Sequence, residues 1–150
     1  MIEGLVIKKL NKYEDDRGYL MEIFRQDEGI IKPLMSYISL TKSNVVRGPH
    51  EHKFQNDFFV FPGPGTFSLY LWDRRKDSKS YGQHEVYEFG ENNPAAVLVP
   101  FGVVHGYKCI SKEPGFSINL PDKLYKGENK QEEVDEIRWE EREDSPYKID

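Results

Sequence analysis

Short runs of β-forming residues recur about every ten residues along the chain, and they restrict its fold more than any other feature. They lie at residues 5–9, 19–24, 35–41, 57–61, 66–72, 84–89, 95–100, 105–110 and 115–120. The alternation is clearest in 66–72, where Phe67, Leu69 and Leu71 fall on one face. Clusters of Gly, Pro, Asn and Asp separate the runs, as is typical of turns. The pattern predicts an all-β fold, either a two-sheet jelly roll or a small barrel.

Length and composition restrict the class of protein further. The chain has 150 residues, which suits a single domain over 1–150, and residues 126–150 form a highly charged tail. We expect this tail to be a short helix or a solvated extension that packs on a neighbour, without a catalytic role. The formal net charge of −5 argues against binding to nucleic acid. No apolar run reaches membrane-spanning length, and the single cysteine, Cys109, fits a cytoplasmic protein.

Two histidine motifs carry most of the chemistry that the sequence predicts. The first is His-x-His, at His50 and His52, and an extended backbone there would place both side chains on one face. The second is Pro-x-Gly-x-x-His, which begins at Pro100 and ends at His105. In this order the two motifs resemble those of cupin-type jelly rolls. The resemblance implies that adjacent strands bring the three histidines together at the mouth of a barrel.

Four segments narrow this resemblance to one family. They are DDRG at 15–18, VVRGPH at 45–50, LWDRRKDSKSYG at 71–82 and VPFGVVHGY at 99–107. In composition and order they resemble segments of the dTDP-4-dehydrorhamnose 3,5-epimerase family of the cupin superfamily. The resemblance implies a cupin-type double-stranded β-helix that needs no cofactor. It also implies a homodimer in which the partner's N-terminal segment completes the site.

The resemblance further implies chemistry on a nucleotide-activated 4-keto-6-deoxy sugar. A base removes a proton next to the C4 ketone, an enolate forms, and an acid returns a proton on the opposite face. His50 falls at the position of the family's catalytic base, with Tyr125 and His52 as the expected acid–base partners. Arg17 falls at the position of a family arginine that contacts the diphosphate of the substrate. The remaining residues expected at the substrate site are Arg47, Gln55, Asp57, His105 and Tyr107, the last also a candidate acid.

Several positions depart from the family pattern, so the sequence leaves the exact reaction open. Asp57 stands where the family has a lysine for the enolate oxygen, and Ile118 where it has the tyrosine acid. His52 replaces a glutamine, and Asp135 is a candidate for the aspartate that orients the base. Single epimerisation, double epimerisation, sugar 3,4-ketoisomerisation and non-catalytic nucleotide-sugar binding are the alternatives.

The same histidines also fit a metal site. Three imidazoles from His50, His52 and His105, with an oxygen from Gln55 or Asp57, resemble the site of metal-dependent cupins. Iron, manganese, zinc or nickel would suit these ligands. The main prediction is a metal-free enzyme, and the three-histidine metal site is its alternative.

Overall fold

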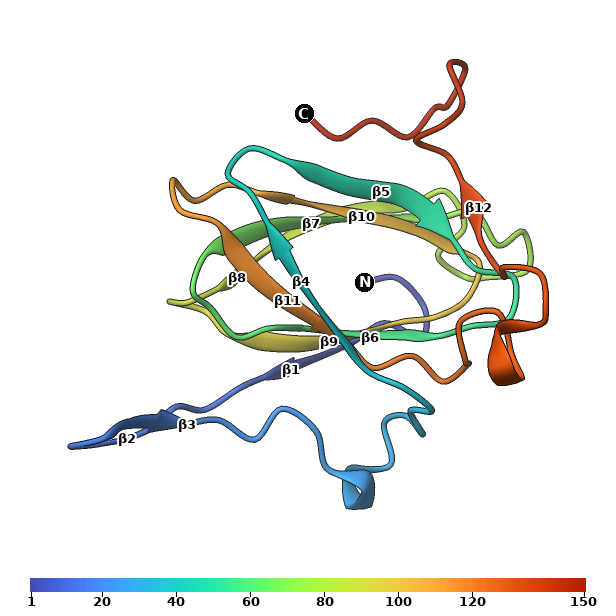
Figure 1. Ribbon diagram of the computed structural model, residues 1–150. Helices are drawn as coiled ribbons and strands as arrows, with labels where there is room; N and C mark the ends of the chain where they lie inside the picture. The colour runs from blue at the N-terminus through green and yellow to red at the C-terminus, as the bar shows by residue number, and fades with distance from the viewer.

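The computed structural model describes residues 1–150, and almost all of its regular structure is β (Figure 1). Two five-stranded antiparallel sheets face each other, with the strand orders β1-β9-β6-β11-β4 and β12-β5-β10-β7-β8. Strands β2 and β3 form a separate hairpin. This arrangement confirms the predicted all-β jelly roll.

The twelve strands are short. Their bounds are β1 Val6–Lys9, β2 Tyr13–Asp15, β3 Gly18–Leu20, β4 Tyr37–Thr41, β5 Val46–Glu51, β6 Asp57–Phe61, β7 Thr66–Asp73, β8 His84–Gly90, β9 Ala95–Val99, β10 Val103–Cys109, β11 Gly115–Asn119 and β12 Ile137–Arg138. Two single-turn 3-10 helices, η1 Gln26–Glu28 and η2 Glu128–Lys130, complete the regular structure. No helix is long and apolar enough to span a membrane.

Apolar side chains fill the space between the sheets. Phe67, Leu69 and Leu71 of β7 are completely buried, as their alternation predicts. The ring of Tyr107 packs edge to face on its neighbours, for example on Phe61 at a centroid distance of 5.5 Å. Each large apolar side chain buried in this way contributes roughly 1.5–3 kcal/mol to stability. The core therefore provides a rigid support for the polar residues at its edge.

Strand β5 was obscured in the sequence by its Gly48 and Pro49. Its pairing with β10 shifts register between His105 and Tyr107, where β5 has one residue more than β10. Proline is tolerated at such a bulge. Gly48 has φ of +84°, and a Cβ atom there would lie 2.8 Å from the His105 carbonyl oxygen, so this position requires glycine. The bulge fixes the backbone just before His50.

The C-terminal segment differs most from its prediction. Instead of forming one short helix or a solvated extension, it contains the single turn η2 and the strand β12, which pairs with β5 in the register Ile137↔Glu51 and Arg138↔His50. The Trp139 and Glu140 amides then both donate to the Pro49 carbonyl oxygen at 3.0 Å. Pairing is possible because β5 would otherwise be an edge strand with unpaired backbone groups. The charged segment is thereby attached to the strand that carries His50.

The N-terminal hairpin β2–β3 stands away from the body of the molecule (Figure 1). Every one of its residues is exposed, and Tyr13, Tyr19 and Leu20 present large apolar surface to solvent. The predicted strand at 19–24 continues only to Leu20. A two-stranded hairpin of this size has little stability by itself.

Candidate active site

The register of β5 against β10 brings the two histidine motifs together. His50 and His105 are direct partners across the two strands. Their ring centroids lie 4.6 Å apart, and the rings of His50 and His52 lie 5.5 Å apart. The prediction that all three imidazoles meet at one end of the barrel is confirmed.

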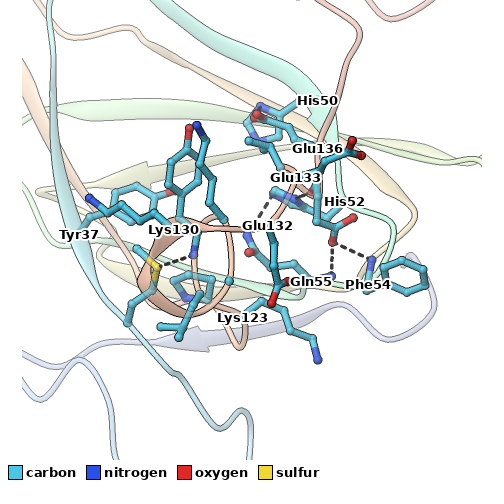
Figure 2. A pocket seen from close by; sticks show the side chains of 18 of the residues that line it. Tyr37, His50, His52, Phe54, Gln55, Lys123, Lys130, Glu132, Glu133 and Glu136 are labelled. Carbon is cyan, nitrogen blue, oxygen red and sulfur yellow. Dashed lines mark hydrogen bonds and ion pairs between the residues drawn. The ribbon is translucent and has the colours of Figure 1, made fainter.

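A cavity of about 950 Å³ opens beside His50 and His52 (Figure 2). This volume is in the range of small-molecule sites. One wall comes from Met35 and Tyr37, and a second comes from the C-terminal segment. The lining residues of that segment are Pro121, Lys123, Leu124, Tyr125, Lys126, Gly127, Asn129, Lys130, Glu132, Glu133, Val134, Asp135, Glu136 and Arg138. The charged tail, which was expected to have no catalytic role, thus forms much of the cavity wall.

Asp57 and His105 lie beneath the cavity and do not line it. They are 1% and 2% exposed. The Asp57 Oδ2 atom is 3.1 Å from His52 Nε2 and 3.2 Å from His105 Nε2. Its other oxygen, Oδ1, accepts from Gln55 Nε2 at 2.9 Å and from Asn119 Nδ2 at 2.7 Å. A buried carboxylate is costly unless it is paired, and His52 and His105 are the neighbours that pair with Asp57.

The two histidines that line the cavity have opposite electrostatic environments. Burial, together with the neighbouring His105 and His52, holds the pKa of His50 well below its ordinary value. His50 is therefore neutral near pH 7 and able to accept a proton. Burial also disfavours the charged form of His52, but the Asp57 carboxylate outweighs it and raises the pKa of His52 to about 9.

The carboxylate nearest to His50 is that of Glu136, which the sequence analysis missed. Glu136 Oε1 lies 3.6 Å from His50 Nδ1, and its side chain is only 16% exposed. Asp135, the predicted orienting residue, has another role: its carboxylate accepts the backbone N–H groups of residues 53–55. Asp135 and Glu136 both line the cavity, and they are held there because β12, directly after them, pairs with β5. That pairing has no sequence signature.

Two tyrosines line the cavity, and only one of them was predicted. Tyr125 is 48% exposed, and its backbone N–H contacts the Met35 sulfur at 3.2 Å. Tyr37, which was not predicted, directs its hydroxyl inward, where it accepts from Asn119 Nδ2 at 2.9 Å. Although its ring is partly exposed, burial of the hydroxyl raises the pKa of Tyr37 to about 12. Asn119 therefore links Tyr37 to Asp57.

Besides Asp57 and His105, three further predicted substrate residues lie outside the cavity. Tyr107 is wrong as a site residue, because it is a core residue whose hydroxyl contacts Ser117 Oγ at 2.9 Å. Arg47 is exposed and connects the two sheets, donating to Thr41 Oγ1 at 2.9 Å and to the Leu40 carbonyl at 3.0 Å. Arg17 is on the exposed hairpin, paired with Asp15. Gln55, by contrast, lies at the cavity wall as predicted.

The comparison with protein families identifies the chain at this point. A family model described as dTDP-4-dehydrorhamnose 3,5-epimerase matches residues 1–143. The chain belongs to this family. Membership confirms the resemblance seen in the four sequence segments, and with it the prediction of a sugar-nucleotide epimerase or isomerase.

Similar proteins agree with this assignment. The spore coat polysaccharide biosynthesis protein SpsL of Bacillus subtilis is 40% identical over 116 residues, 76% of this chain and 76% of that protein. A Haloferax volcanii protein named "Probable low-salt glycan biosynthesis epimerase Agl13" is 38% identical over 135 residues, 88% of this chain and 86% of its own length.

Solved structures show the same fold. A dTDP sugar isomerase from Desulfovibrio desulfuricans matches with a TM-score of 0.83 over 98% of this chain and 91% of its own, at 19% identity. A dTDP-4-dehydrorhamnose 3,5-epimerase from Sulfolobus tokodaii matches with a TM-score of 0.71 over 79% of this chain and 70% of its own, at 25% identity. These matches confirm the cupin-type jelly roll.

Proposed function

We propose that this enzyme epimerises a nucleotide-activated 4-keto-6-deoxy sugar, with His50 as the base that removes the proton next to the C4 ketone. The observation that carries the proposal is the position of His50. It is a neutral imidazole at the wall of a substrate-sized cavity, with Glu136 beside one ring nitrogen. The names of the family and of the glycan-biosynthesis relatives support the substrate class.

The environment of His50 suits proton abstraction from carbon. The Glu136 carboxylate beside Nδ1 favours the tautomer with the proton on that nitrogen, which leaves Nε2 with a free lone pair. A base that is neutral at the working pH can take up the proton without first losing one. His52 lines the same cavity and, when protonated, supplies positive charge for the enolate oxygen.

The returning proton needs an acid on another side of the substrate. Tyr37 suits this role because it lies on the opposite sheet from His50, lines the same cavity and stays protonated near neutral pH. Tyr125 is the second candidate, as the sequence predicts. Its phenol lacks the hydrogen-bond link to Asp57 that fixes the Tyr37 hydroxyl.

The nucleotide diphosphate needs cations at the mouth of the cavity. Lys123, Lys126 and Lys130 line this region, and Figure 2 shows Lys123 and Lys130 at the cavity. Arg17 is too remote to line it within one chain. In a homodimer, the exposed hairpin β2–β3 of one protomer can cover the edge strand β4 of its partner, where Ile38 and Leu40 are exposed. Such a dimer would bring Arg17 to the partner's diphosphate.

The buried, unpaired Cys109 is consistent with a cytoplasmic location, which is the compartment that we propose.

The reaction is tested by incubation of the enzyme with dTDP-4-keto-6-deoxyglucose in deuterium oxide. We expect deuterium to enter at C3, at C5 or at both. The rate should fall at least about 100-fold in a His50→Ala variant. The control is His84→Ala, because His84 lies on β8 and belongs to neither histidine motif. Tight binding of the nucleotide sugar without exchange would instead indicate a non-catalytic binder.

A further inference from the structure

The charged tail holds strand β5 from both faces. His50 and Glu51 are consecutive in β5, so their side chains point to opposite faces of the sheet. On the cavity side, Glu136 Oε1 lies 3.6 Å from His50 Nδ1. On the outer side, the Trp139 indole N–H donates to Glu51 Oε1 at 3.1 Å. Figure 1 shows the chain continuing from β12 along the outer side of β5 to the C-terminus.

Glu51 is a buried charged residue that the proposed chemistry does not use. It is 3% exposed, and a buried carboxylate is costly unless it is paired. Its partners are the Arg74 guanidinium and the Trp139 indole, which both donate to Oε1. Hydrogen bonds to a charged acceptor are stronger than those between neutral groups. Glu51 therefore gives the tail a fixed point of attachment on β5.

The ring of Trp139 is held by further contacts. The guanidinium groups of Arg74 and Arg142 lie 5.0 and 4.3 Å from its ring, within the range of cation–π interactions. The Tyr147 ring packs edge to face on it at a centroid distance of 5.0 Å. Because Arg142 and Tyr147 follow Trp139 in the tail, the last residues of the chain pack back onto the indole.

Strand β12 needs such an anchor because it has only two residues. A shift of one residue in strand pairing turns every side chain to the other face of the sheet. Glu136 directly precedes β12, so a shift would take its carboxylate away from His50. Backbone groups pair in any register, whereas the bond from the Trp139 indole to Glu51 depends on which side chains lie opposite each other. This bond therefore favours the observed register.

The same register sets the direction of the Glu136 carboxylate. Arg138 lies opposite His50 in the pairing of β12 with β5. Its Nε–H donates to Glu136 Oε2 at 3.0 Å, which leaves Oε1 for His50. Both contacts of Glu136 thus depend on the position of β12.

We propose that Trp139 is a positioning residue for the reaction. Its bond to Glu51 fixes the register of β12, and that register holds Glu136 beside the base. The inference rests on the proposed function, because it assumes that Glu136 assists His50 in proton abstraction. Trp139 itself lies on the outer side of β5, away from the substrate.

The test measures solvent-deuterium exchange by Trp139→Phe, which keeps an aromatic ring but lacks the N–H that binds Glu51. We expect kcat to fall about 5-fold while KM stays unchanged. In a Glu136→Gln background the same substitution should lower kcat by less than about 2-fold, because the group through which Trp139 acts is already neutralised.

The matched control is Trp72→Phe, which should keep the wild-type kcat. Trp72 is also an aromatic residue beside the tail, with its ring centroid 5.5 Å from that of Tyr147. It lies on β7, however, and its indole does not bind Glu51. A loss of kcat in Trp72→Phe equal to that in Trp139→Phe would contradict the proposal.

A measurement without substrate separates this inference from the proposed function. The Glu136 carboxylate favours the His50 tautomer that carries its hydrogen on Nδ1, and nitrogen NMR of the histidine rings reports the tautomer. We expect Trp139→Phe to shift the His50 signals in the same direction as Glu136→Gln does. Trp72→Phe should leave them unchanged.

Three further results would overturn the proposal: an unchanged kcat in Trp139→Phe, an equal loss of kcat with and without Glu136→Gln, or unchanged His50 signals. If the wild type catalyses no exchange, the proposed function fails, while the His50 signals still test the positioning of Glu136. If Trp139→Phe does not fold, as judged by circular dichroism, Trp139→Met replaces it with the same expected results, because methionine also lacks the donor.

Discussion

Two carboxylates are almost equally buried in this molecule, and their surroundings differ. Asp57 and Asp73 are 1% and 2% exposed. Both oxygens of Asp73 are satisfied: Arg75 donates from its backbone and its guanidinium, and Ser78 and Ser80 each donate at 2.6 Å. Asp57 has two amide donors on Oδ1, and its Oδ2 faces only the ring nitrogens of His52 and His105, at 3.1 and 3.2 Å.

The difference separates a structural carboxylate from a functional one. All the side-chain donors to Asp73 come from residues 75–80, so it closes a local loop after β7. The groups around Asp57 come from β5, β10, β11 and the loop after β5, and they surround a cavity. A fully satisfied buried network stabilises the fold, whereas an unsatisfied one persists at a cost in stability. The following predictions test this contrast.

Replacement of Asp73 should have the largest effect on stability. Asp73→Asn leaves the Arg75 guanidinium without its anion, so we expect a loss of about 3 kcal/mol in the free energy of unfolding. Urea denaturation measures this loss. The exchange rate of the variant, measured where it is still folded, should match that of the wild type. A variant as stable as the wild type would show that the loop network does not support the fold.

Removal of the Tyr37 hydroxyl should mainly affect catalysis. Tyr37→Phe deletes the proposed acid, so we expect inversion of the substrate centre to slow about 100-fold. The free energy of unfolding should change by no more than about 1 kcal/mol. Product analysis by NMR measures inversion, and Tyr125→Phe is the matched control. If Tyr125→Phe shows the larger loss, the acid is the residue predicted from the sequence instead.

Neutralisation of Glu136 should have a smaller effect. Glu136→Gln keeps a polar group near His50 Nδ1 but removes the negative charge that stabilises the protonated imidazole. We expect the rate of proton abstraction to fall about 10-fold, with little change in KM. Asp135→Asn provides a contrast, because its carboxylate holds the loop at 53–55 and does not face His50. Equal rates for the wild type and Glu136→Gln would exclude a role in positioning His50.

The smallest effect concerns acid stability. Burial opposes ionisation of Asp73, but Arg75, Ser78 and Ser80 outweigh it and hold its pKa well below the ordinary value of 3.8. A carboxyl with a lowered pKa stabilises the fold above its unfolded pKa, and this contribution is lost as the pH falls through the folded pKa. The stability difference between wild type and Asp73→Asn should therefore shrink below about pH 4. A stability difference between the two proteins that instead grows as the pH falls would contradict this prediction.

Much of the fold could be predicted because its central strands stand out as apolar runs, continuous in β6 and alternating in β7. Residues 57–61 and 66–72 were placed to within one residue, since each buries a regular set of apolar side chains. Strand β5 was hidden by Gly48 and Pro49, which form a bulge. Strand β12 was hidden because its two residues lie in a charged segment and depend on backbone pairing with β5. Patterns of side chains do not report such pairing.

The site was only partly predictable for a related reason. His50, His52 and His105 stand in motifs with a fixed spacing, and their convergence follows from pairing of adjacent strands. Tyr37 and Glu136 come from segments without such a motif, and only the folded chain brings them to the cavity. Tyr107 was misplaced because the residue after Gly106 points into the core. Motif spacing thus identifies the centre of the site but not its walls.

The most direct test of the account measures two properties on Asp57→Asn and Asp73→Asn side by side. These are the rate of solvent-deuterium exchange into the 4-keto nucleotide sugar and the free energy of unfolding. We predict that Asp57→Asn loses about 100-fold in exchange rate, while its free energy of unfolding changes by less than about 1 kcal/mol. Asp73→Asn should keep the wild-type exchange rate and lose about 3 kcal/mol in the free energy of unfolding. Full exchange activity in Asp57→Asn would contradict the account.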